Sequence, residues 1–207
     1  MILCDVGNSR IHFYDGEHLR HFSHAEGLKR FKNEKVYYIC VNERMQSRIE
    51  EEAPGWTDIS GRGVLETRYR GLGADRKAVC LAICDGVVVD AGSAVTVDVM
   101  ERGTHLGGWI WPGISAFKKA YAGISGALDV EMDPAILTGR LPLDTASAVN
   151  FAVFASVKKL VESFASGRPV TITGGDAALF APLFTGAVVD ELLVFRGMEK
   201  MIKEKRC

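Results

Sequence analysis

Short apolar runs and regularly spaced apolar residues divide the chain into strands and helices. Apolar, β-branched and aromatic runs between Gly, Asn or Asp predict strands, and apolar residues three or four positions apart predict helices. The strands are expected at residues 1–6, 11–14, 18–23, 36–41, 87–91, 95–100, 105–111, 170–173 and 188–194. The helices are expected at residues 27–33, 43–53, 75–84, 115–124, 146–164, 176–183 and 197–205. Either residues 57–59 or residues 64–67 supply one further strand.

This order of elements occurs twice along the chain. Three strands joined by tight turns are followed by helices that alternate with strands, first in residues 1–86 and again in residues 87–207. The stretches LCDVGNSRIHF and VVDAGSAVTVD share the order apolar, apolar, Asp, any residue, Gly, polar, and then a strand. We therefore expect an α/β protein of two halves, 1–86 and 87–207, with the last helix able to pack on the first half.

The turn that follows Asp5 has the features of an anion-binding site. Gly7 lets backbone N–H groups approach an anion closely, and Ser9 adds a hydroxyl donor. The Asp5 carboxylate would repel a bare phosphate. It is therefore consistent with a Mg²⁺ ion that lies between the carboxylate and the phosphate. Either turn taken alone is more typical of an ordinary hairpin with an acid in its turn. The second copy, at Asp90, favours two turns that approach one nucleoside triphosphate from opposite sides of a cleft.

Two other glycine-rich stretches bear on the nucleotide. The stretch VTITGGDAALF ends a buried strand at Gly174 and Gly175, where a base or ribose can lie flat on the backbone. The stretch GLGADR has only two of the three glycines of a dinucleotide fingerprint, and the chain contains no P-loop sequence. A P-loop fold is therefore excluded.

Composition narrows the classes of partner. The chain has 207 residues, with 25 basic and 26 acidic side chains and a formal net charge of -1, which gives no hint of a nucleic-acid surface. No apolar run approaches the roughly 18–20 residues that span a bilayer, and no signal peptide is visible. The five cysteines lack the spacing of a disulfide framework, so a cytoplasmic protein with mostly core cysteines is expected, without nucleic-acid or membrane partners.

Five motifs together resemble a known family. DVGNS, GLGADR, DAGSAVTVD, GGWIWPG and TGGDA occur in the order found in type III pantothenate kinases, and the resemblance runs from residue 1 to about residue 198. These enzymes belong to the acetate and sugar kinase, heat-shock 70 and actin superfamily. The resemblance implies duplicated ribonuclease-H-like domains with mixed five-stranded sheets flanked by helices. It also implies a homodimer, with the substrate bound near the interface, that phosphorylates pantothenate with ATP to 4′-phosphopantothenate, the first step of coenzyme A biosynthesis.

The resemblance also implies roles for individual residues. Asp75 is the expected base for the primary hydroxyl of pantothenate, and Asp90 the expected ligand of a monovalent cation, K⁺ or NH₄⁺. ATP is expected to come with Mg²⁺ near Asp5. The residues implied for ATP are Asp5, Val6, Gly7, Asn8, Ser9, Arg10, Ile11, His12 and Ser93. The residues implied for pantothenate are Tyr69, Gly73, Ala74, Asp75, Arg76 and Thr145.

These roles agree with the chemistry of phosphoryl transfer, which needs alignment and neutralisation of charge. A carboxylate can accept the proton of a bound alcohol, and a guanidinium can pair with the carboxylate of pantothenate. An ion pair within the fold is the alternative for Arg76. Ser93 stands where most members of the family have Thr, and Asn150 and Phe151 depart from the usual pattern. The acceptor could therefore be another small hydroxy acid, and a regulator without kinase activity is the other alternative.

Several other side chains suggest sites but have simpler interpretations. A strand and turn would scatter His18, His21 and His24 rather than gather them round a metal ion. Cys80 and Cys84 lie one helical turn apart and are expected in the core, because no further cluster of Cys or His completes a metal site. The pair Trp109 and Trp111 is expected either in the core or at a dimer interface.

Overall fold

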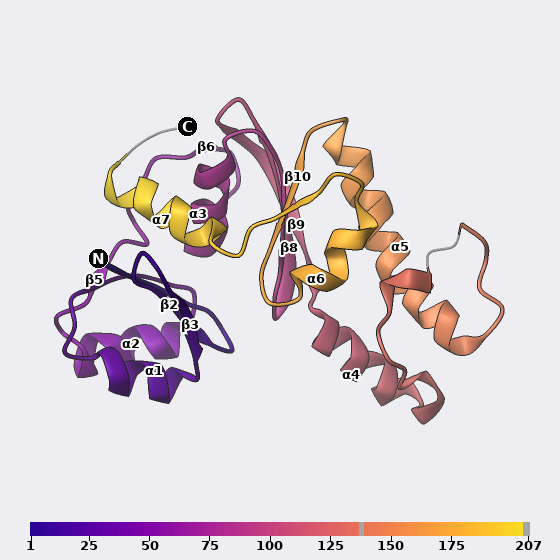
Figure 1. Ribbon diagram of the computed structural model, residues 1–207, viewed down its shortest axis with the longest axis horizontal. Coiled ribbons are helices and arrows are strands. Elements are labelled where there is room, and N and C mark those ends of the chain that lie inside the picture. The colour runs from indigo at the N-terminus through magenta and orange to yellow at the C-terminus, as the bar shows by residue number, and fades with distance from the viewer. Residues whose placement is uncertain (137–138, 205–207) are drawn as a thin grey trace. The chain divides into compact units, whose positions relative to one another are not determined.

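The computed structural model describes residues 1–136 and 139–204. It shows an α/β protein (Figure 1) whose helices and strands alternate as the sequence predicts. The chain divides into two compact units, which are described separately below. Unit 1 comprises Met1–Cys84, Arg102–His105 and Leu192–Cys207, and unit 2 comprises Asp85–Glu101 and Leu106–Glu191.

Unit 1 contains a mixed sheet of five strands in the order β3-β2-β1-β4-β5. The central strand β1 pairs antiparallel with β2 and parallel with β4. Strand β3 pairs antiparallel with β2, and β5 pairs parallel with β4. The strands are β1 (Ile2–Val6), β2 (Ile11–Tyr14), β3 (Leu19–Phe22), β4 (Val36–Cys40) and β5 (Thr57–Asp58).

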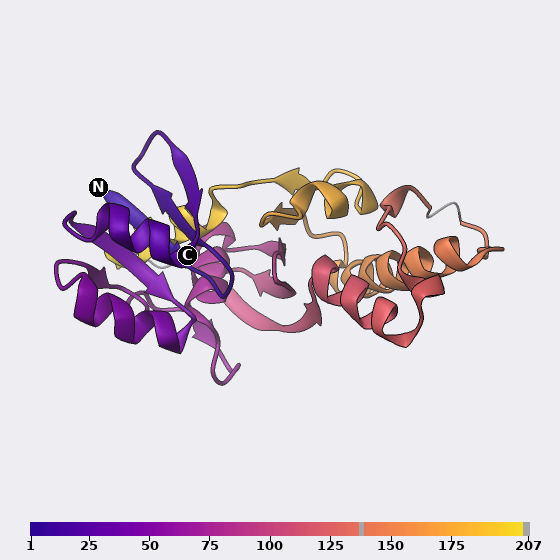
Figure 2. The ribbon, with the colours of Figure 1, turned by 90° about the horizontal axis from the view of Figure 1, so that it is seen from below.

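Two pairs of helices pack on this sheet, and each pair buries its own apolar cluster. Helices α1 (His24–Phe31) and α2 (Glu43–Glu52) lie side by side (Figures 1 and 2). Their residues Leu28, Phe31, Met45 and Ile49 pack with Phe13 and other side chains of one face of the sheet. Helices α3 (Ala74–Ile83) and α7 (Leu193–Ile202) share a second cluster, which contains Leu3, Ile39, Leu81, Phe195 and Met198. Each burial removes apolar surface from water and so stabilises unit 1.

Helix α7 is held closely against α3. Nζ of Lys200 donates to the carbonyl oxygens of Leu81 (2.7 Å) and Ala82 (3.3 Å), which lie in the last turn of α3. The helix ends at Cys84, whose φ of 57° is left-handed. Cys84 is disulfide-bonded, so the expectation that it is a core thiol was wrong. Cys4, Cys40 and Cys80 form no disulfide, and both Cys4 and Cys80 are fully buried.

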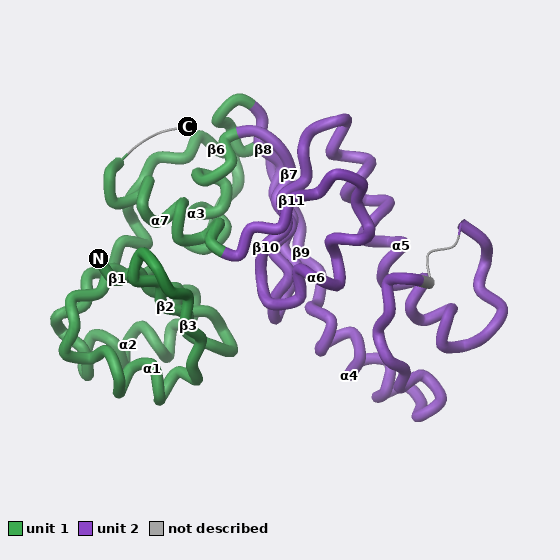
Figure 3. The backbone as a smooth tube through the Cα atoms, viewed as in Figure 1, with its two compact units in different colours: residues 1–84, 102–105, 192–207 green, residues 85–101, 106–191 purple. Residues whose placement is uncertain are grey.

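Unit 2 is built round a second mixed sheet (Figure 3), whose strand order is β11-β10-β7-β8-β9-β6. Strand β7 pairs antiparallel with β8 and parallel with β10. The strands are β7 (Gly86–Ala91), β8 (Ala94–Glu101), β9 (Thr104–Pro112), β10 (Val170–Thr173) and β11 (Val188–Val189). The first residues of β9, which belong to unit 1, pair with β6 (Glu66–Thr67).

The longest helix of unit 2 covers the core of its sheet. Helix α5 (Thr145–Ala165) buries Val153, Phe154, Val157 and Val161 against the valines of β7 and β8. Asp144 caps its first turn by accepting the backbone N–H of Ser147 at 2.9 Å. The shorter elements are α4 (Ile114–Ile124), α6 (Ala177–Phe180) and the 3₁₀ turns Gly126–Leu128, Pro134–Ile136 and Ala181–Leu183.

The structure corrects the expected elements at three places. Both alternatives for the further strand form one, because residues 57–58 join β4 and residues 66–67 join β9. The second sheet therefore has six strands where five were expected. Residues 193–194 begin α7 and do not extend β11, because Val194, Met198 and Met201 lie at helical spacing and bury one face. Among the described residues, no helix combines the length and the apolar character needed to cross a membrane.

Candidate functional site

The first predicted phosphate turn joins β1 to β2 in unit 1. The backbone N–H of Gly7 donates to the carbonyl oxygen of Arg10 at 3.1 Å and closes the turn. Asn8, Ser9 and Arg10 are exposed at its tip, while Asp5 is half-buried in β1. The turn therefore presents backbone and hydroxyl donors to solvent beside a carboxylate, as a site for phosphate and Mg²⁺ requires.

Histidines surround this turn. Nε2 of His24, at the start of α1, lies 2.9 Å from the carbonyl oxygen of Gly7. His12 stands opposite Asp5 on the neighbouring strand and opposite His21 on the next. Burial, with the nearby charges of His21, Arg10 and His24, lowers the pKa of His12 to about 4. The His12 ring is therefore neutral at pH 7.

The predicted acceptor residues are grouped at the start of α3. Gly73 is the N-cap of this helix and Asp75 lies in its first turn, where the helix dipole favours a negative charge. Oδ1 of Asp75 accepts the backbone N–H of Arg76 at 2.7 Å. A Cβ atom at Gly73 would lie 2.5 Å from that same oxygen, so the carboxylate keeps its place only because residue 73 has no side chain.

Arg76 joins this group to Tyr69. Its Nη1 donates to the Tyr69 hydroxyl at 3.0 Å, and its Cζ lies 4.7 Å from the centre of the Tyr69 ring. Arg76 is only 5% exposed. The backbone N–H of Tyr69 donates to Oγ1 of Thr67, which lies 2.8 Å from Nδ1 of His105. Tyr69, Gly73, Asp75 and Arg76 are thus brought together within unit 1 by contacts along the chain and across the helix.

The second predicted turn joins β7 to β8 in unit 2. Asp90 is half-buried in β7, opposite Thr96 on β8 and Thr173 on β10. This position matches that of Asp5, which stands between an antiparallel and a parallel neighbour in unit 1. The backbone N–H of Gly92 donates to the carbonyl oxygen of Ala94 at 3.0 Å and closes the turn.

Two further glycines let other backbone segments reach this turn. Gly113, the N-cap of α4, donates its N–H to the Ser93 carbonyl at 3.1 Å. A Cβ at Gly113 would lie 2.2 Å from the Gly92 carbonyl oxygen, and one at Gly174 would lie 2.6 Å from Oδ1 of Asp90. Glycine at both positions therefore lets two further backbone segments lie close to the turn that carries Asp90 and Ser93.

The remaining predicted residues of unit 2 lie near the start of α5. Thr145 is the first residue of this helix and is exposed. Asn150 is 1% exposed, and its side chain accepts the backbone N–H of Asp133 (2.7 Å) and donates to the carbonyl oxygens of Glu131 (2.9 Å) and Ala146 (3.0 Å). Asn150 therefore holds the segment before α5 in place.

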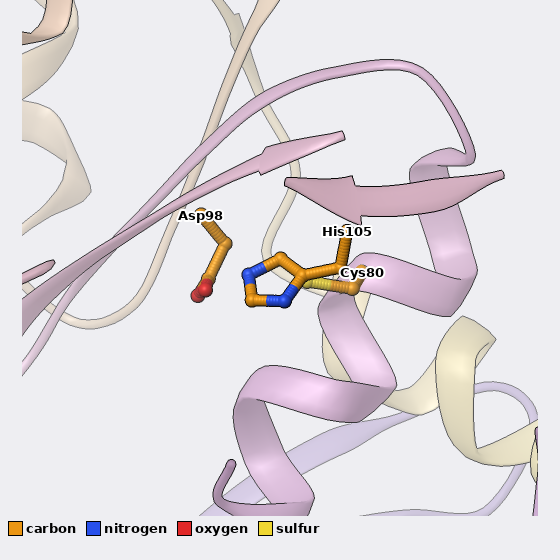
Figure 4. A group of neighbouring side chains, drawn as sticks. All are labelled: Cys80, Asp98 and His105. Carbon is orange, nitrogen blue, oxygen red and sulfur yellow. The ribbon is translucent and has the colours of Figure 1, made fainter. Parts of the chain in front are cut away.

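A group that sequence reasoning missed contains Cys80, Asp98 and His105 (Figure 4). All three are buried, and one potential ligand atom from each lies within 4.8 Å of those of the other two. Thiolate, carboxylate and imidazole are ligand types of Zn²⁺. Cys80 is fully buried, as expected of a core residue, but two further potential ligands that the sequence did not indicate lie beside it. The group combines residues from a helix and from both strands of a hairpin, and nothing in their spacing indicates that they meet.

The other candidate side chains have structural contacts. His18 is exposed, whereas His21 meets His12 and His24 meets Gly7, so the three do not gather as one site. Trp109 and Trp111 pack edge to face, with ring centres 5.7 Å apart, against the core of unit 2. Both side chains are partly buried, which agrees with a place beside the core, and the alternative of a dimer interface stays a prediction.

Comparisons with known proteins assign the family. The family model described as type III pantothenate kinase matches residues 58–166 of the chain. A type III pantothenate kinase of Helicobacter hepaticus is 40% identical over 205 residues, which cover 99% of this chain and all of the relative. A Campylobacter jejuni enzyme of the same name is 40% identical over 206 residues, or 99% of this chain and 97% of the relative. The chain belongs to the type III pantothenate kinase family.

Solved structures agree with this membership of the type III pantothenate kinases. One from Campylobacter jejuni, described as a Baf family transcriptional activator, has a TM-score of 0.89 and 38% identity, and covers 99% of this chain and 98% of its own. The ethanolamine utilization protein EutJ of Carboxydothermus hydrogenoformans has a TM-score of 0.57 and 16% identity, covers 97% of this chain and 89% of its own, and supports the α/β fold alone.

Proposed function

We propose that this chain phosphorylates the 4′-hydroxyl of pantothenate with ATP and that Asp75 accepts the proton of that hydroxyl. The observation that carries the assignment is the group of Tyr69, Asp75 and Arg76 at the start of α3, in a chain 40% identical over its whole length to type III pantothenate kinases. A regulator that binds without chemistry has no need for such a carboxylate.

Asp75 is suited to the role of general base. Its carboxylate is held by the N–H of Arg76 in the space that Gly73 leaves open, so that it is aligned before the substrate arrives. As the oxygen of the alcohol attacks the γ-phosphorus atom, the O–H proton passes to the carboxylate and the bond to the β-phosphate oxygen breaks. The γ-phosphoryl group is thereby transferred to pantothenate, and ADP leaves.

We assign the nucleotide phosphates to residues 5–12 and to Ser93. The exposed N–H groups and the Ser9 hydroxyl at the first turn suit phosphate oxygens. The Asp5 carboxylate beside them is a hard oxygen ligand of the kind that Mg²⁺ takes in such sites, and Mg²⁺ would neutralise phosphate charge there. Asp90 and the polar backbone groups around it fit a monovalent cation, K⁺ or NH₄⁺.

We assign pantothenate to the residues near Asp75 and to Thr145. The guanidinium of Arg76 is the cation nearest the proposed base in sequence, and a planar fork of donors matches a carboxylate. Its hydrogen bond to Tyr69 orients both side chains. The ribonuclease-H-like identity of the two halves, a homodimer with the site near its interface, and a cytoplasmic location complete the proposal.

The test is a coupled assay of ADP release with pantothenate, without it, and with a panel of other small hydroxy acids. The proposal expects release that depends on pantothenate and a product heavier by one phosphoryl group in mass spectra. Release that is independent of every acceptor would contradict it. Turnover of a different acid alone would assign another acceptor.

The name of the similar Campylobacter jejuni structure favours one second candidate, a transcriptional regulator on the same fold. With a formal net charge of -1, such a protein would act through a protein partner. Absence of any pantothenate-dependent ADP release would favour this candidate over the kinase.

A further inference from the structure

One pair of side chains close to the first turn has a geometry that phosphate binding does not require, although His12 of this pair belongs to the segment assigned to the nucleotide. His12 and His21 stand directly opposite each other on the antiparallel strands β2 and β3. Their Nδ1 atoms are 2.5 Å apart, and their rings meet edge to face with centres 4.8 Å apart. The two Nδ1 atoms therefore face each other across the strand pair, close enough for one ion to contact both after a small opening.

Two neutral imidazoles at this separation need one shared hydrogen, because one Nδ1 must donate and the other must accept. A contact of 2.5 Å is shorter than the usual range for a hydrogen bond from nitrogen. A divalent ion removes the need for that hydrogen, since both nitrogens can then present lone pairs. Zn–N bonds of about 2.0–2.1 Å in tetrahedral geometry place the two nitrogens about 3.3 Å apart, so the pair has to open by less than about 1 Å.

The surroundings allow this opening. Strand β3 lies at the edge of its sheet, and His21 is exposed there, so its ring can shift without disturbing the core. A surface hollow that water can enter lies beside His21. Its lining residues are Ser9, Arg10, His21, Phe22, Ser23 and Glu26. His24 is already bonded to the Gly7 carbonyl and is not needed.

We infer that His12 and His21 form a two-histidine site for a divalent transition-metal ion of the Zn²⁺, Ni²⁺ or Cu²⁺ class. Imidazole nitrogen suits these ions, whereas the Mg²⁺ of the kinase reaction prefers oxygen. The two protein ligands leave the remaining positions to water. The inference does not rest on the proposed function, because it concerns binding alone.

The test uses the full chain without an affinity tag, in a buffer that does not chelate metals. Calorimetric titration with ZnCl₂ and NiCl₂ is expected to show a site whose affinity falls at least tenfold in His21→Ala. His18→Ala, which removes an exposed histidine near the same strand, is expected to bind as the unchanged protein does. Cys80→Ala separates this site from the group of Cys80, Asp98 and His105 and is expected to leave it intact.

A spectroscopic measurement on the unchanged protein keeps the test independent of folding in the variants. Bound Cu²⁺ is expected to show coupling to two imidazole nitrogens in its electron paramagnetic resonance spectrum, and His21→Ala is expected to reduce this to one. The inference is overturned if the unchanged protein shows no such coupling. It is also overturned if a folded His21→Ala, checked by circular dichroism, binds metal with unchanged affinity, or if Cys80→Ala alone abolishes binding.

Discussion

Asp75 has a fixed carboxylate at the start of a helix. Its replacement by Asn tests whether this carboxylate accepts the proton of the alcohol. Asp75→Asn keeps the size of the side chain and removes its ability to take a proton. We expect kcat to fall by about 10²–10⁴-fold, the usual contribution of a general base. The measurement is the steady-state rate of ADP release with saturating pantothenate and ATP.

Glu43→Gln is the matched control for Asp75→Asn, because Glu43 is also a carboxylate in the first turn of a helix of unit 1 but lies in the exposed first turn of α2. Its kcat is expected to remain within about twofold of that of the unchanged enzyme, as for surface substitutions away from a site. Equal rates for Asp75→Asn and Glu43→Gln would remove Asp75 from the proposed role.

Asp90 gives a second prediction for a single residue. If its carboxylate binds a monovalent cation, activity is high in potassium or ammonium chloride and drops in sodium chloride at equal ionic strength. Asp90→Asn is expected to lower activity in potassium and to abolish the difference between the three salts, because the charge that binds the cation is gone and no ion then occupies the site. Equal rates of the unchanged enzyme in all three salts would contradict the assignment of Asp90 as the ligand of a monovalent cation.

Asp15 links stability to pH. Its Oδ1 accepts the backbone N–H groups of Glu17 (3.0 Å) and His18 (2.8 Å), and Nη2 of Arg20 lies 2.9 Å from Oδ2. These backbone bonds, more than the charge of Arg20, lower the pKa from 3.8 to about 2. Because the folded value lies below the unfolded one, the ionised carboxylate stabilises the fold above pH 3.8, and this stabilisation is lost as the pH falls to about 2.

Asp15→Asn is therefore expected to lower the free energy of unfolding at pH 7 and to lower it less as the pH falls below 3.8. Urea unfolding at a series of pH values measures the difference between the two proteins. Glu17→Gln changes a neighbouring exposed carboxylate and is expected to show no such trend. A constant difference from pH 7 to pH 2 would mean that the Asp15 charge contributes nothing.

At the level of elements, the crossing of α3 and α7 depends on one glycine. A Cβ atom at Gly197 would lie 1.9 Å from the carbonyl oxygen of Ala78, so Gly197→Ala must push the two helices apart. We expect a loss of about 1–3 kcal/mol in the free energy of unfolding, as for other overpacked cores. Urea unfolding at neutral pH measures it.

Gly123 is the matched control, because it lies within helix α4 and a Cβ there would meet nothing within 4 Å. Gly123→Ala is expected to raise stability by about 0.5–1 kcal/mol, since alanine loses less conformational entropy in a helix. If both variants gained stability, α7 would not pack on α3 as closely as the structure has it.

The sequence predicts elements well where only one periodicity fits. Residues 36–41 read as a buried parallel strand because every position is apolar, β-branched or aromatic, and β4 is parallel to β1 in the structure. Residues 188–194 are also largely apolar, but such a run suits a strand and the start of a helix equally, so the boundary of α7 was misplaced. Tertiary packing decides where α7 begins, and the local pattern of apolar residues does not predict that packing.

The candidate site divides in the same way. The turns at Asp5 and Asp90 are visible in the sequence because turn residues and an acid are adjacent along the chain. The contact of Arg76 with Tyr69, the group round His105 and the pair of His12 with His21 are not visible, because each depends on which side chains face one another after folding. Register across strands brings His12 and His21 together, and the packing of helix α3 brings Arg76 and Cys80 to their partners.

At the scale of the whole molecule, each unit repeats one arrangement of strands. In unit 1 the acid-bearing strand β1 lies between an antiparallel neighbour and a parallel one, and in unit 2 the acid-bearing strand β7 does the same. Asp5 and Asp90 thereby occupy equivalent positions at the ends of their strands. This equivalence is the structural counterpart of the repeated sequence pattern, and it supports the proposal that both turns serve one reaction.

Phosphoryl transfer requires both substrates on the enzyme at once, so the binding of one is expected to affect the binding of the other. Calorimetric titration of pantothenate is expected to give a lower Kd in the presence of Mg²⁺ and a non-hydrolysable ATP analogue, by about 5–150-fold, the range of typical coupling free energies. Adenosine, which lacks the phosphates, is the control and is expected to leave the Kd unchanged. Identical pantothenate affinities in all three titrations would mean that the nucleotide phosphates and the alcohol do not share one site, and the assignment of the two turns to a single triphosphate would then be wrong.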